Sequence, residues 1–306
     1  MKIKYLDVNI LNRKVIIWGH KNGHTHGYIH SSYFKAFKSM GYDTYWFDDS
    51  DDVSGFNFDD CIFLTEDQVQ HNIPLNKTSK YILHHTKLDK YIDNGLDFIN
   101  LANYLKYCDT GIDKAYNEGN TLEKVNECCF WDEKTRTIHQ PWGTDLLPKE
   151  IILSDARLSN LITNNINYIG IAHENAPNIN LFANSVRVKG KNFNLIRGRT
   201  DVENMGLIRD SLISVDIRGD WHKECGYLPC RVFKNISYGR LTGTNSENVK
   251  NIMGDHVIYE PDPTLLYDKM IESERDKSLG DVKDAMLYVK EHHTYINRIN
   301  NLINFL

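Results

Sequence analysis

Short apolar runs alternate with amphipathic segments along the first part of the chain. The run Lys14 to Gly19, KVIIWG, ends in glycine and is typical of a strand buried on both faces. Tyr28 to Met40 carries aromatic side chains at helical spacing, and Gly41 fits the C-cap of that helix. Asp43 to Phe47 is rich in aromatic residues and predicts a second strand. This order of strand, helix and strand predicts a βαβ unit of a doubly wound sheet.

The alternation continues to a connection that prolines and glycines interrupt. That connection runs from His139 to Pro148, and its composition favours a domain boundary there. Before it, strands are predicted at Asp60 to Thr65, Lys80 to His85 and Thr137 to His139, whereas Phe98 to Leu105 is ambiguous and the polar stretch Asn117 to Asn126 indicates a loop or a short helix.

A second α/β series follows the boundary. Two domains of this kind are expected to enclose a cleft and to place ligands at the carboxyl ends of their strands. A long helix is predicted to close the chain from Asp281 to Leu306. Strands are predicted at Asn167 to Ala172, Asn192 to Arg197, Leu212 to Ile217 and His256 to Glu260, with helices at Asn178 to Val188 and Val202 to Ser211.

Composition narrows the classes of function. The net charge of −5 over 306 residues gives no basic field that would favour nucleic acid or an anionic membrane. Apolar runs stay shorter than the ~18 residues of a membrane span, and the N-terminus lacks the apolar core of a signal peptide. The six cysteines do not follow a zinc or redox spacing. We therefore expect a cytoplasmic protein with reduced thiols, without a transmembrane segment or a nucleic-acid partner, and the oligomeric state stays open.

Glu224 to Glu247 holds the most specific chemistry of the chain. A Gly-Pro turn leads into an amphipathic helix that begins near Cys230, and a short strand then leads to a run of small hydroxyl and amide residues. Helix starts beside such donor-rich loops bind anions, because free backbone N–H groups and the helix dipole point outward there. Arg231 and Lys234, one helical turn apart, add positive charge to one face. This pattern predicts a ligand that carries a diphosphate.

The same stretch carries a resemblance to a known family. Gly226 to Gly239, followed by Thr242-Gly-Thr-Asn-Ser246, resembles the nucleotide-sugar site of GT-B fold glycosyltransferases, and most closely the family 4 and CgeB-like (spore-maturation-like) branch. Ile138 to Asp145 with Pro148 is similar to the interdomain strand of that family, and Glu291 to Ile299 to its closing helix. The resemblance implies two Rossmann-like domains, residues 1–143 on the acceptor side and 144–285 on the donor side, with 286–306 packing back on the first domain.

The family also implies roles for residues of the donor domain. Arg231 would neutralise the donor diphosphate, and Thr244, Asn245 and Ser246 would donate to phosphate oxygens. The alternative for these small residues is ordinary helix N-capping by Asn245 or Ser246, and both roles can hold at once. The sequence departs from the family at Lys234, where a ribose-binding glutamate is usual. Either the ribose contact moves to Asn235 or Glu224, or Lys234 binds phosphate, or the site is unusual or inactive. Two further candidates for the donor site are Tyr227 and Arg199, each with a purely structural alternative.

Histidines supply the candidate chemistry of the acceptor side. His24 and His26 follow the first predicted strand, and His85 ends a later one. Imidazoles there suit the deprotonation of an acceptor hydroxyl because they titrate near neutral pH. A metal site is the rival chemical interpretation, but no carboxylate or cysteine completes a ligand spacing, and the family resemblance implies no required metal and no bound cofactor. Histidines of a polar loop without a role are the third possibility.

Taken together, these patterns predict a glycosyltransferase of the hexosyl or deoxyhexosyl class that acts in glycan biosynthesis. Its donor would be a UDP- or GDP-linked sugar and its acceptor a carbohydrate. An inverting enzyme would need one of the histidines as a base, whereas a retaining enzyme would not, and the sequence does not choose between them. The alternatives are a catalytically degenerate nucleotide- or sugar-binding protein of the same fold, and a nucleotide-sugar epimerase or hydrolase.

Overall fold

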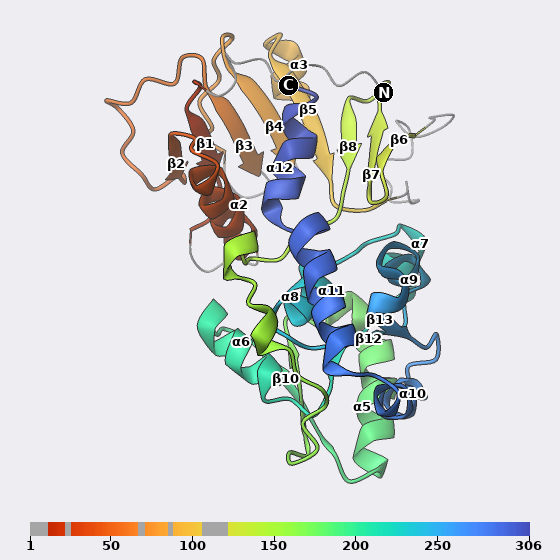
Figure 1. Cartoon of the computed structure of the whole chain (residues 1–306). Helices are drawn as coiled ribbons and strands as arrows, with labels where there is room; N and C mark the ends of the chain where they lie inside the picture. The colour runs from red at the N-terminus through yellow and green to blue at the C-terminus, as the bar shows by residue number, and fades with distance from the viewer. Residues whose placement is uncertain (1–11, 22–25, 67–70, 85–87, 106–121) are drawn as a thin grey trace. The chain divides into compact units, whose positions relative to one another are not determined.

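The computed structural model describes residues 12–21, 26–66, 71–84, 88–105 and 122–306. These residues divide into two compact units (Figure 1). Unit 1 contains the described residues up to 145 together with 295–306, and unit 2 contains residues 146–294. Each unit combines helices with parallel strands, so the chain has the mixed α/β architecture that the sequence predicts.

Unit 1 is built on an eight-stranded sheet with the order β2-β1-β3-β4-β5-β8-β7-β6. The first six strands in this order pair in parallel, and β7 and β6 complete one edge in the antiparallel sense. β1 is buried along its whole length, as its continuous apolar run predicts. The strands are β1 Val15–Trp18, β2 Thr44–Phe47, β3 Ile62–Glu66, β4 Lys80–His84, β5 Asp97–Ala102, β6 Glu123–Asn126, β7 Cys129–Asp132 and β8 Thr137–His139.

Helices from opposite ends of the chain pack together in unit 1. α2 (Gly27–Ser39) and α12 (Tyr295–Ile303) meet where the rings of Tyr33 and Tyr295 lie 4.6 Å apart, centroid to centroid (Figure 1). Arg298 of α12 is fully buried, and its Nε donates to the carbonyl oxygen of Pro141 at 2.8 Å. The inward face of α12 is therefore part of the unit 1 core. A short helix, α3 (Asp89–Asp93), lies between β4 and β5 in the chain.

Unit 2 has two groups of parallel strands. β9 (Asn165–Ile169) pairs with β10 (Asn192–Ile196), and β11 (Ser214–Asp216) and β13 (Val257–Tyr259) flank β12 (Thr242–Thr244). A backbone hydrogen bond of 2.7 Å from the N–H of Leu212 to the oxygen of Asn165 joins the two groups. The helices are α5 Ala176–Val188, α6 Asp201–Arg209, α7 Asp220–Glu224, α8 Cys230–Ser237, α9 Glu247–Met253, α10 Leu266–Arg275 and α11 Leu279–His292, with 3₁₀ turns η1 Pro148–Glu150, η2 Leu153–Asp155, η3 His173–Asn175 and η4 Gly254–His256.

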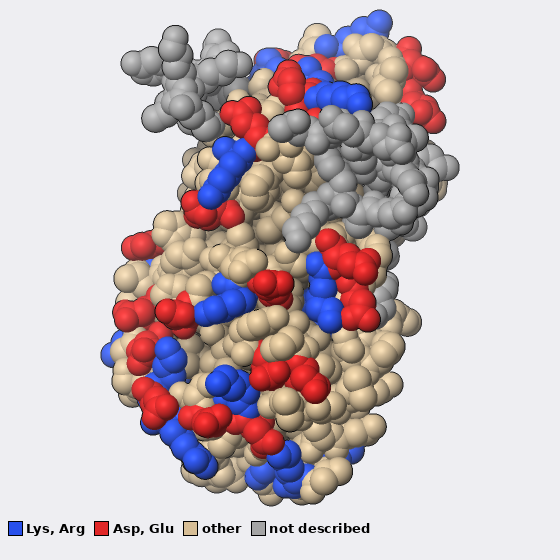
Figure 2. All heavy atoms as spheres, turned by 90° about the vertical axis from the view of Figure 1, so that its right-hand side faces the viewer, with Lys and Arg blue, Asp and Glu red and all other residues tan. Residues whose placement is uncertain are grey.

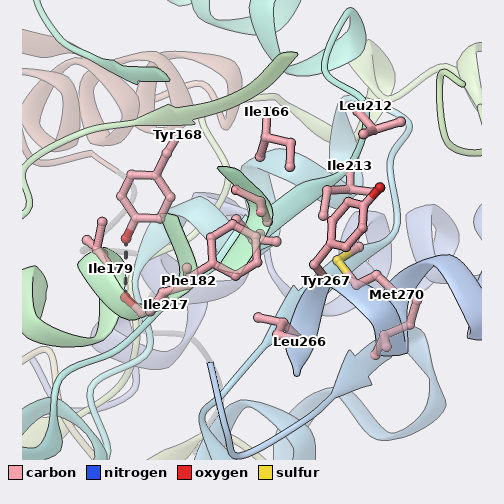
Figure 3. Packing of buried hydrophobic residues seen from close by; sticks show 13 residues of the cluster. Ile166, Tyr168, Ile179, Phe182, Leu212, Ile213, Ile217, Leu266, Tyr267 and Met270 are labelled. Atoms are coloured by element: carbon pink, nitrogen blue, oxygen red, sulfur yellow. Dashed lines mark hydrogen bonds between the residues drawn. The ribbon is translucent and has the colours of Figure 1, made fainter. Parts of the chain in front are cut away.

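The core of unit 2 lies between these strands and the helices α5 and α10. Figure 3 shows Phe182 of α5 and Met270 of α10 among the apolar side chains of the strands. The ring of Tyr168 belongs to the same cluster, and its hydroxyl donates to the carbonyl oxygen of Ile217 at 3.2 Å (Figure 3). This hydrogen bond ties the end of β9 to the segment after β11, and so fixes the edge of the unit where both strands end.

Most predicted strands are present in the structure. The sequence patterns before the boundary at residues 14–19, 43–47, 60–65, 80–85 and 137–139 correspond to β1, β2, β3, β4 and β8, and the ambiguous pattern 98–105 covers most of β5. Residue 85, the last residue of one predicted strand, lies outside the described residues. In the second series the predicted strands and helices correspond to β9, β10, β11 and β13 and to α5 and α6.

The long C-terminal helix is a wrong prediction. The helix expected over Asp281 to Leu306 is two helices, α11 and α12, separated by His293 and Thr294. His293 leaves the helical conformation at φ −130° and ψ 31°, and its ring stacks on Phe233 of α8 with centroids 4.5 Å apart. This packing contact and the low helix propensity of the β-branched Thr294 explain the break.

The prediction for Asn117 to Asn126 is also wrong in its described part. Glu123–Asn126 forms β6 rather than a loop or a helix, and residues 117–121 lie outside the described residues. The polar composition hid this strand, because β6 gains its stability from pairing with β7 and not from its own propensity. The pattern also left β7, α3, α7 and α10 unpredicted.

Charged side chains are mixed by sign over the surface drawn in Figure 2. On that face, Lys and Arg side chains alternate with Asp and Glu side chains. This mixture agrees with the small net charge of −5. Among the described helices, none is both long enough and apolar enough to cross a membrane.

Candidate functional site

The strands of unit 2 bring polar residues together at their carboxyl ends. β9 ends at Ile169, β11 at Asp216 and β12 at Thr244. α8 begins at Cys230, and its second residue, Arg231, reaches the end of β9 with its side chain. The carboxyl ends of parallel strands are where open α/β sheets commonly bind ligands, so this edge is the candidate site of unit 2.

Three hydrogen bonds and one ring contact fix the side chain of Arg231. Its Nε donates to the carbonyl oxygen of Ile169 at 2.8 Å, and its Nη1 donates to the Tyr168 hydroxyl at 2.8 Å and to Asp216 Oδ1 at 2.9 Å. The guanidinium lies 4.1 Å from the centre of the Tyr168 ring. Its Nη2 donates to no described residue, so two N–H groups of a pre-oriented cation remain for a ligand.

A second arginine shares the same carboxylate. Arg218 Nη2 contacts Asp216 Oδ1 at 2.5 Å, and both side chains are buried. Burial alone would lower the pKa of Arg218, but the Asp216 carboxylate and the nearby tyrosines more than offset this effect and raise it. Two guanidinium groups with one carboxylate leave this cluster one positive charge, which suits an anionic ligand.

Some buried polar atoms of this cluster lack a protein partner. Asp216 Oδ2, Arg218 Nε and Ser246 Oγ have no hydrogen-bond partner among the described residues. Buried polar atoms in proteins are normally hydrogen-bonded, and an unpaired one costs about 1–3 kcal/mol. Their concentration at one edge favours a polar ligand or ordered water there.

Gly170 makes room for Arg231. It has a positive φ of 124°, and a Cβ at this position would lie 2.5 Å from Arg231 Nη2. Any side chain at residue 170 would therefore displace the guanidinium or strain the backbone. Glycine at the end of β9 is thus a requirement of the observed arginine geometry.

We predict that Gly170→Ala lowers the affinity for a nucleoside diphosphate at least about tenfold, equivalent to ~1.4 kcal/mol. The added methyl group displaces Nη2, and the positive φ adds backbone strain of about 1–3 kcal/mol. Gly190→Ala is the matched control, because residue 190 also has a positive φ (71°) but a Cβ there would meet no atom within 4 Å. Isothermal titration calorimetry of both variants checks the prediction, and equal affinities would contradict it.

The other predicted donor residues lie at different distances from this cluster. Tyr227 belongs to it, since the guanidinium of Arg218 lies 5.9 Å from its ring centre and burial raises the pKa of its hydroxyl to about 12. Asn245 also belongs to it, because its side chain bonds both the N–H and the carbonyl oxygen of Arg218, at 2.7 and 2.9 Å. Thr244 Oγ1 accepts the N–H of Ser246 at 3.2 Å, and both residues are fully buried.

Lys234, Asn235 and Arg199 have other surroundings. Lys234 Nζ lies 3.2 Å from Asp201 Oδ1, at the start of α6. Asn235 is buried within α8, and Arg199 is exposed beside Glu203. The roles of these residues toward a ribose or a phosphate stay predictions.

Unit 1 has a cluster of histidines at the corresponding edge of its sheet. His26 precedes α2 and lies 3.6 Å, measured from Nδ1, from Oε2 of Glu66 at the end of β3. His84, the last residue of β4, lies beside it with 5.2 Å between the ring centres. The two other candidates, His24 and His85, lie outside the described residues. Among the residues that the structure describes, no three side chains of His, Cys, Asp or Glu form a group that would hold a metal ion.

Sequence reasoning missed several members of both clusters. Glu66 was not selected because a single acidic residue at the end of an apolar strand forms no recognisable motif. The sequence pattern also did not assign Asp216, Arg218, Tyr168 or Gly170 to the site. The available signal was position for Glu66, Asp216 and Arg218, which lie at or just beyond the ends of the strands predicted at 60–65 and 212–217, whereas Tyr168 and Gly170 lie within the strand predicted at 167–172.

Comparisons with known proteins identify the fold. No model of a protein family matches the chain, and no curated protein matches it. Solved structures do match: an alpha-glucosyltransferase in complex with UDP superposes with a TM-score of 0.62 at 10% identity, over 95% of this chain and 99% of that one. An alpha-glucosyltransferase with UDP and a 13-mer DNA containing an HMU base gives 0.59 at 10% identity, over 96% and 100%.

A third structure agrees with these two. It is described as trehalose-6-phosphate from E. coli bound with UDP-2-fluoro glucose, and it gives a TM-score of 0.54 at 9% identity over 96% of this chain and 99% of that one. These neighbours are GT-B glycosyltransferases, so the predicted resemblance is confirmed at the level of the fold. Membership of the family 4 and CgeB-like branch stays a prediction.

Proposed function

We propose that this protein transfers a sugar from a nucleoside-diphosphate sugar, UDP- or GDP-linked, to a carbohydrate acceptor in the cytoplasm, as a member of the family 4 and CgeB-like branch. The observation that carries the proposal is Arg231, held at the carboxyl edge of β9 and β11 with Nη2 unpaired among the described residues. The fold supports it, because the similar structures hold UDP or a UDP sugar. In this proposal unit 2 binds the donor and unit 1 the acceptor.

Arg231 would act on the leaving group. As the bond between the sugar and the diphosphate breaks, negative charge grows on the diphosphate oxygens. A guanidinium that is already oriented by Tyr168, Ile169 and Asp216 stabilises that charge without reorganising during the reaction. Asp216 also limits the net positive charge, so that product release is not blocked by two unpaired arginines.

A thermal-shift panel with UDP, GDP, ADP and their sugars tests the donor site. A nucleotide at 100 times its dissociation constant should stabilise the protein by about 2.7 kcal/mol. We expect stabilisation by UDP or GDP and their sugars, and a lack of stabilisation by every nucleotide would contradict the proposal. Incubation of the stabilising donor with oligosaccharides, and with duplex DNA as a second acceptor class, then measures transfer. If the protein binds the donor but catalyses neither sugar transfer nor donor hydrolysis, it is instead a catalytically degenerate binding protein of the same fold.

A further inference from the structure

Three of the most exposed apolar side chains of the chain lie at one end of unit 2. Among the described residues, four large apolar side chains are more than 70% exposed. Leu161 and Ile162 are 74% and 99% exposed in the turn before β9, and Val188 is 88% exposed at the end of α5, whereas the fourth, Val202, lies in α6. Single exposed apolar residues are common on proteins, but a group of them marks an interaction surface. We call Leu161, Ile162 and Val188 the apolar tip.

Hydrogen bonds hold the two segments of the apolar tip side by side. The N–H of Asn192, the first residue of β10, donates to the carbonyl oxygen of Asn164 at 2.9 Å, and Lys191 Nζ donates to Asn164 Oδ1 at 2.7 Å. Asn164 closely follows the turn, and Lys191 lies three residues beyond Val188. Figure 1 shows the end of α5 and the entry into β9 at the same end of unit 2. The apolar tip is therefore one surface made by two parts of the chain.

The local backbone keeps these side chains out of the core. The N–H of Ile162 donates to Asn160 Oδ1 at 3.3 Å, and the N–H of Thr163 donates to the Asn160 carbonyl oxygen at 3.2 Å, so the turn is closed by its own polar groups. In α5, Val186 is buried, and Val188 is two residues further and thus on another side of the helix. Packing among the described residues of unit 2 does not explain why these exposed positions are apolar.

The segment around Val188 carries an excess of positive charge. Three cations lie within three residues of it, namely Arg187, Lys189 and Lys191. Residues 176–200 contain no aspartate and no glutamate. Asp268 of α10 pairs with Lys189, and the other two cations have no carboxylate partner among the described residues. The net charge of −5 of the whole chain does not reveal this local excess.

An anionic lipid surface fits both features of the apolar tip. Aliphatic side chains gain free energy when they leave water for the acyl region of a bilayer, and lysine and arginine are attracted to negatively charged headgroups. A second copy of the chain would instead bring the same cations against one another, and like charges oppose association. A protein partner also fits less well, because the centres of protein interfaces are rich in aromatic residues and the apolar tip has none.

We propose that the apolar tip inserts into the surface of a bilayer that contains anionic lipids, with Arg187 and Lys191 at the level of the lipid phosphates. The apolar tip lies at the amino ends of β9 and β10, whereas Arg231 contacts the carboxyl end of β9. The five residues of β9, about 16 Å of strand, separate the two ends. Binding to a bilayer therefore leaves the candidate site of unit 2 accessible and does not depend on the proposed sugar transfer.

Sedimentation with vesicles tests the proposal on the full chain. The probe is a vesicle made of equal parts of phosphatidylcholine and phosphatidylglycerol, with which the wild-type protein should sediment. The variant with both Leu161→Ser and Ile162→Ser should bind at least about tenfold more weakly, because two aliphatic side chains no longer leave water. A wild-type protein that does not sediment with these vesicles, or a serine variant that binds equally well, would overturn the proposal.

Two single variants separate insertion at the apolar tip from unspecific adsorption. Val202→Ser is the matched control, because Val202 is 80% exposed but lies in α6, beyond the carboxyl end of β10, and this variant should bind as the wild-type protein does. Arg187→Gln removes one cation and should weaken binding to the anionic vesicles about fivefold, with no effect on vesicles of phosphatidylcholine alone. A tenfold loss in Val202→Ser, or undiminished binding by Arg187→Gln, would contradict the proposed surface.

Hydrogen exchange locates the contact, and analytical ultracentrifugation distinguishes lipid from a second copy. Anionic vesicles should slow exchange in residues 158–164 and 187–191, and protection confined to other segments would overturn the proposal. Without lipid, the wild-type protein and the double serine variant should have the same oligomeric state. A wild-type dimer that the two serine substitutions convert to a monomer would show that the apolar tip is an interface between copies, against the proposed lipid surface.

Discussion

Replacement of Arg231 by alanine should lower the rate of sugar transfer by at least about tenfold, and by as much as 10²–10³-fold if its hydrogen bonds form mainly in the transition state. The reason is the loss of a cation that three protein contacts hold in place before the donor binds. Steady-state kinetics with the donor identified by the thermal-shift panel measures the effect. The acceptor KM should stay unchanged, because Arg231 belongs to unit 2.

Two further variants sharpen this result. Arg231→Lys keeps the positive charge, but an ammonium group lacks the rigid planar geometry that lets the guanidinium donate to Ile169 and Asp216 at the same time. The rate of this variant should therefore lie between those of the alanine variant and the wild-type protein. Arg187→Ala removes an exposed arginine at the end of α5 and should have no effect. A wild-type rate in Arg231→Ala would remove Arg231 from the mechanism.

Asp216→Asn should lower the free energy of unfolding of unit 2 by about 3–5 kcal/mol. Asp216 is the buried partner of two arginines, and the neutral amide would leave both guanidinium groups without a counter-charge. Hydrogen exchange of the α5 and β9 peptides reports the stability of unit 2, while peptides of β1 and β3 should show no change and serve as the internal reference.

The matched control is another aspartate whose ion pair water can reach. Asp201 is 51% exposed beside Lys234, and Asp201→Asn should cost less than about 1 kcal/mol. If Asp216→Asn lowered the free energy of unfolding no more than Asp201→Asn does, the charges of the buried cluster would not stabilise unit 2.

The local pattern of the chain predicts much of its fold, and the failures have identifiable causes. The apolar run that forms β1 is buried on both faces, so the composition of the run is sufficient to predict the strand. β6 is the opposite case, because four largely polar residues become a strand only through their pairing with β7. The break before Thr294 is likewise a tertiary effect, since Phe233, sixty residues earlier in the chain, holds the His293 ring.

For the candidate site, the sequence singled out Arg231 but could not predict its partners. Arg231 was selected from its place in a helix after a Gly-Pro turn, and the structure does place it at the carboxyl edge of β9 and β11. Its partners could not be read from the sequence, because Tyr168 and Asp216 are 63 and 15 residues away along the chain. The same holds for Glu66, which meets His26 only when β3 is in place beside α2.

A structure of the protein in complex with UDP tests the proposed donor site most directly. We expect diphosphate oxygens within hydrogen-bond distance of Arg231 Nη2, beside Gly170 at the end of β9, with the Asp216 contact to Nη1 retained. A nucleotide bound elsewhere, with Arg231 in contact only with its present protein partners, would contradict the central claim that this edge of unit 2 is the donor site.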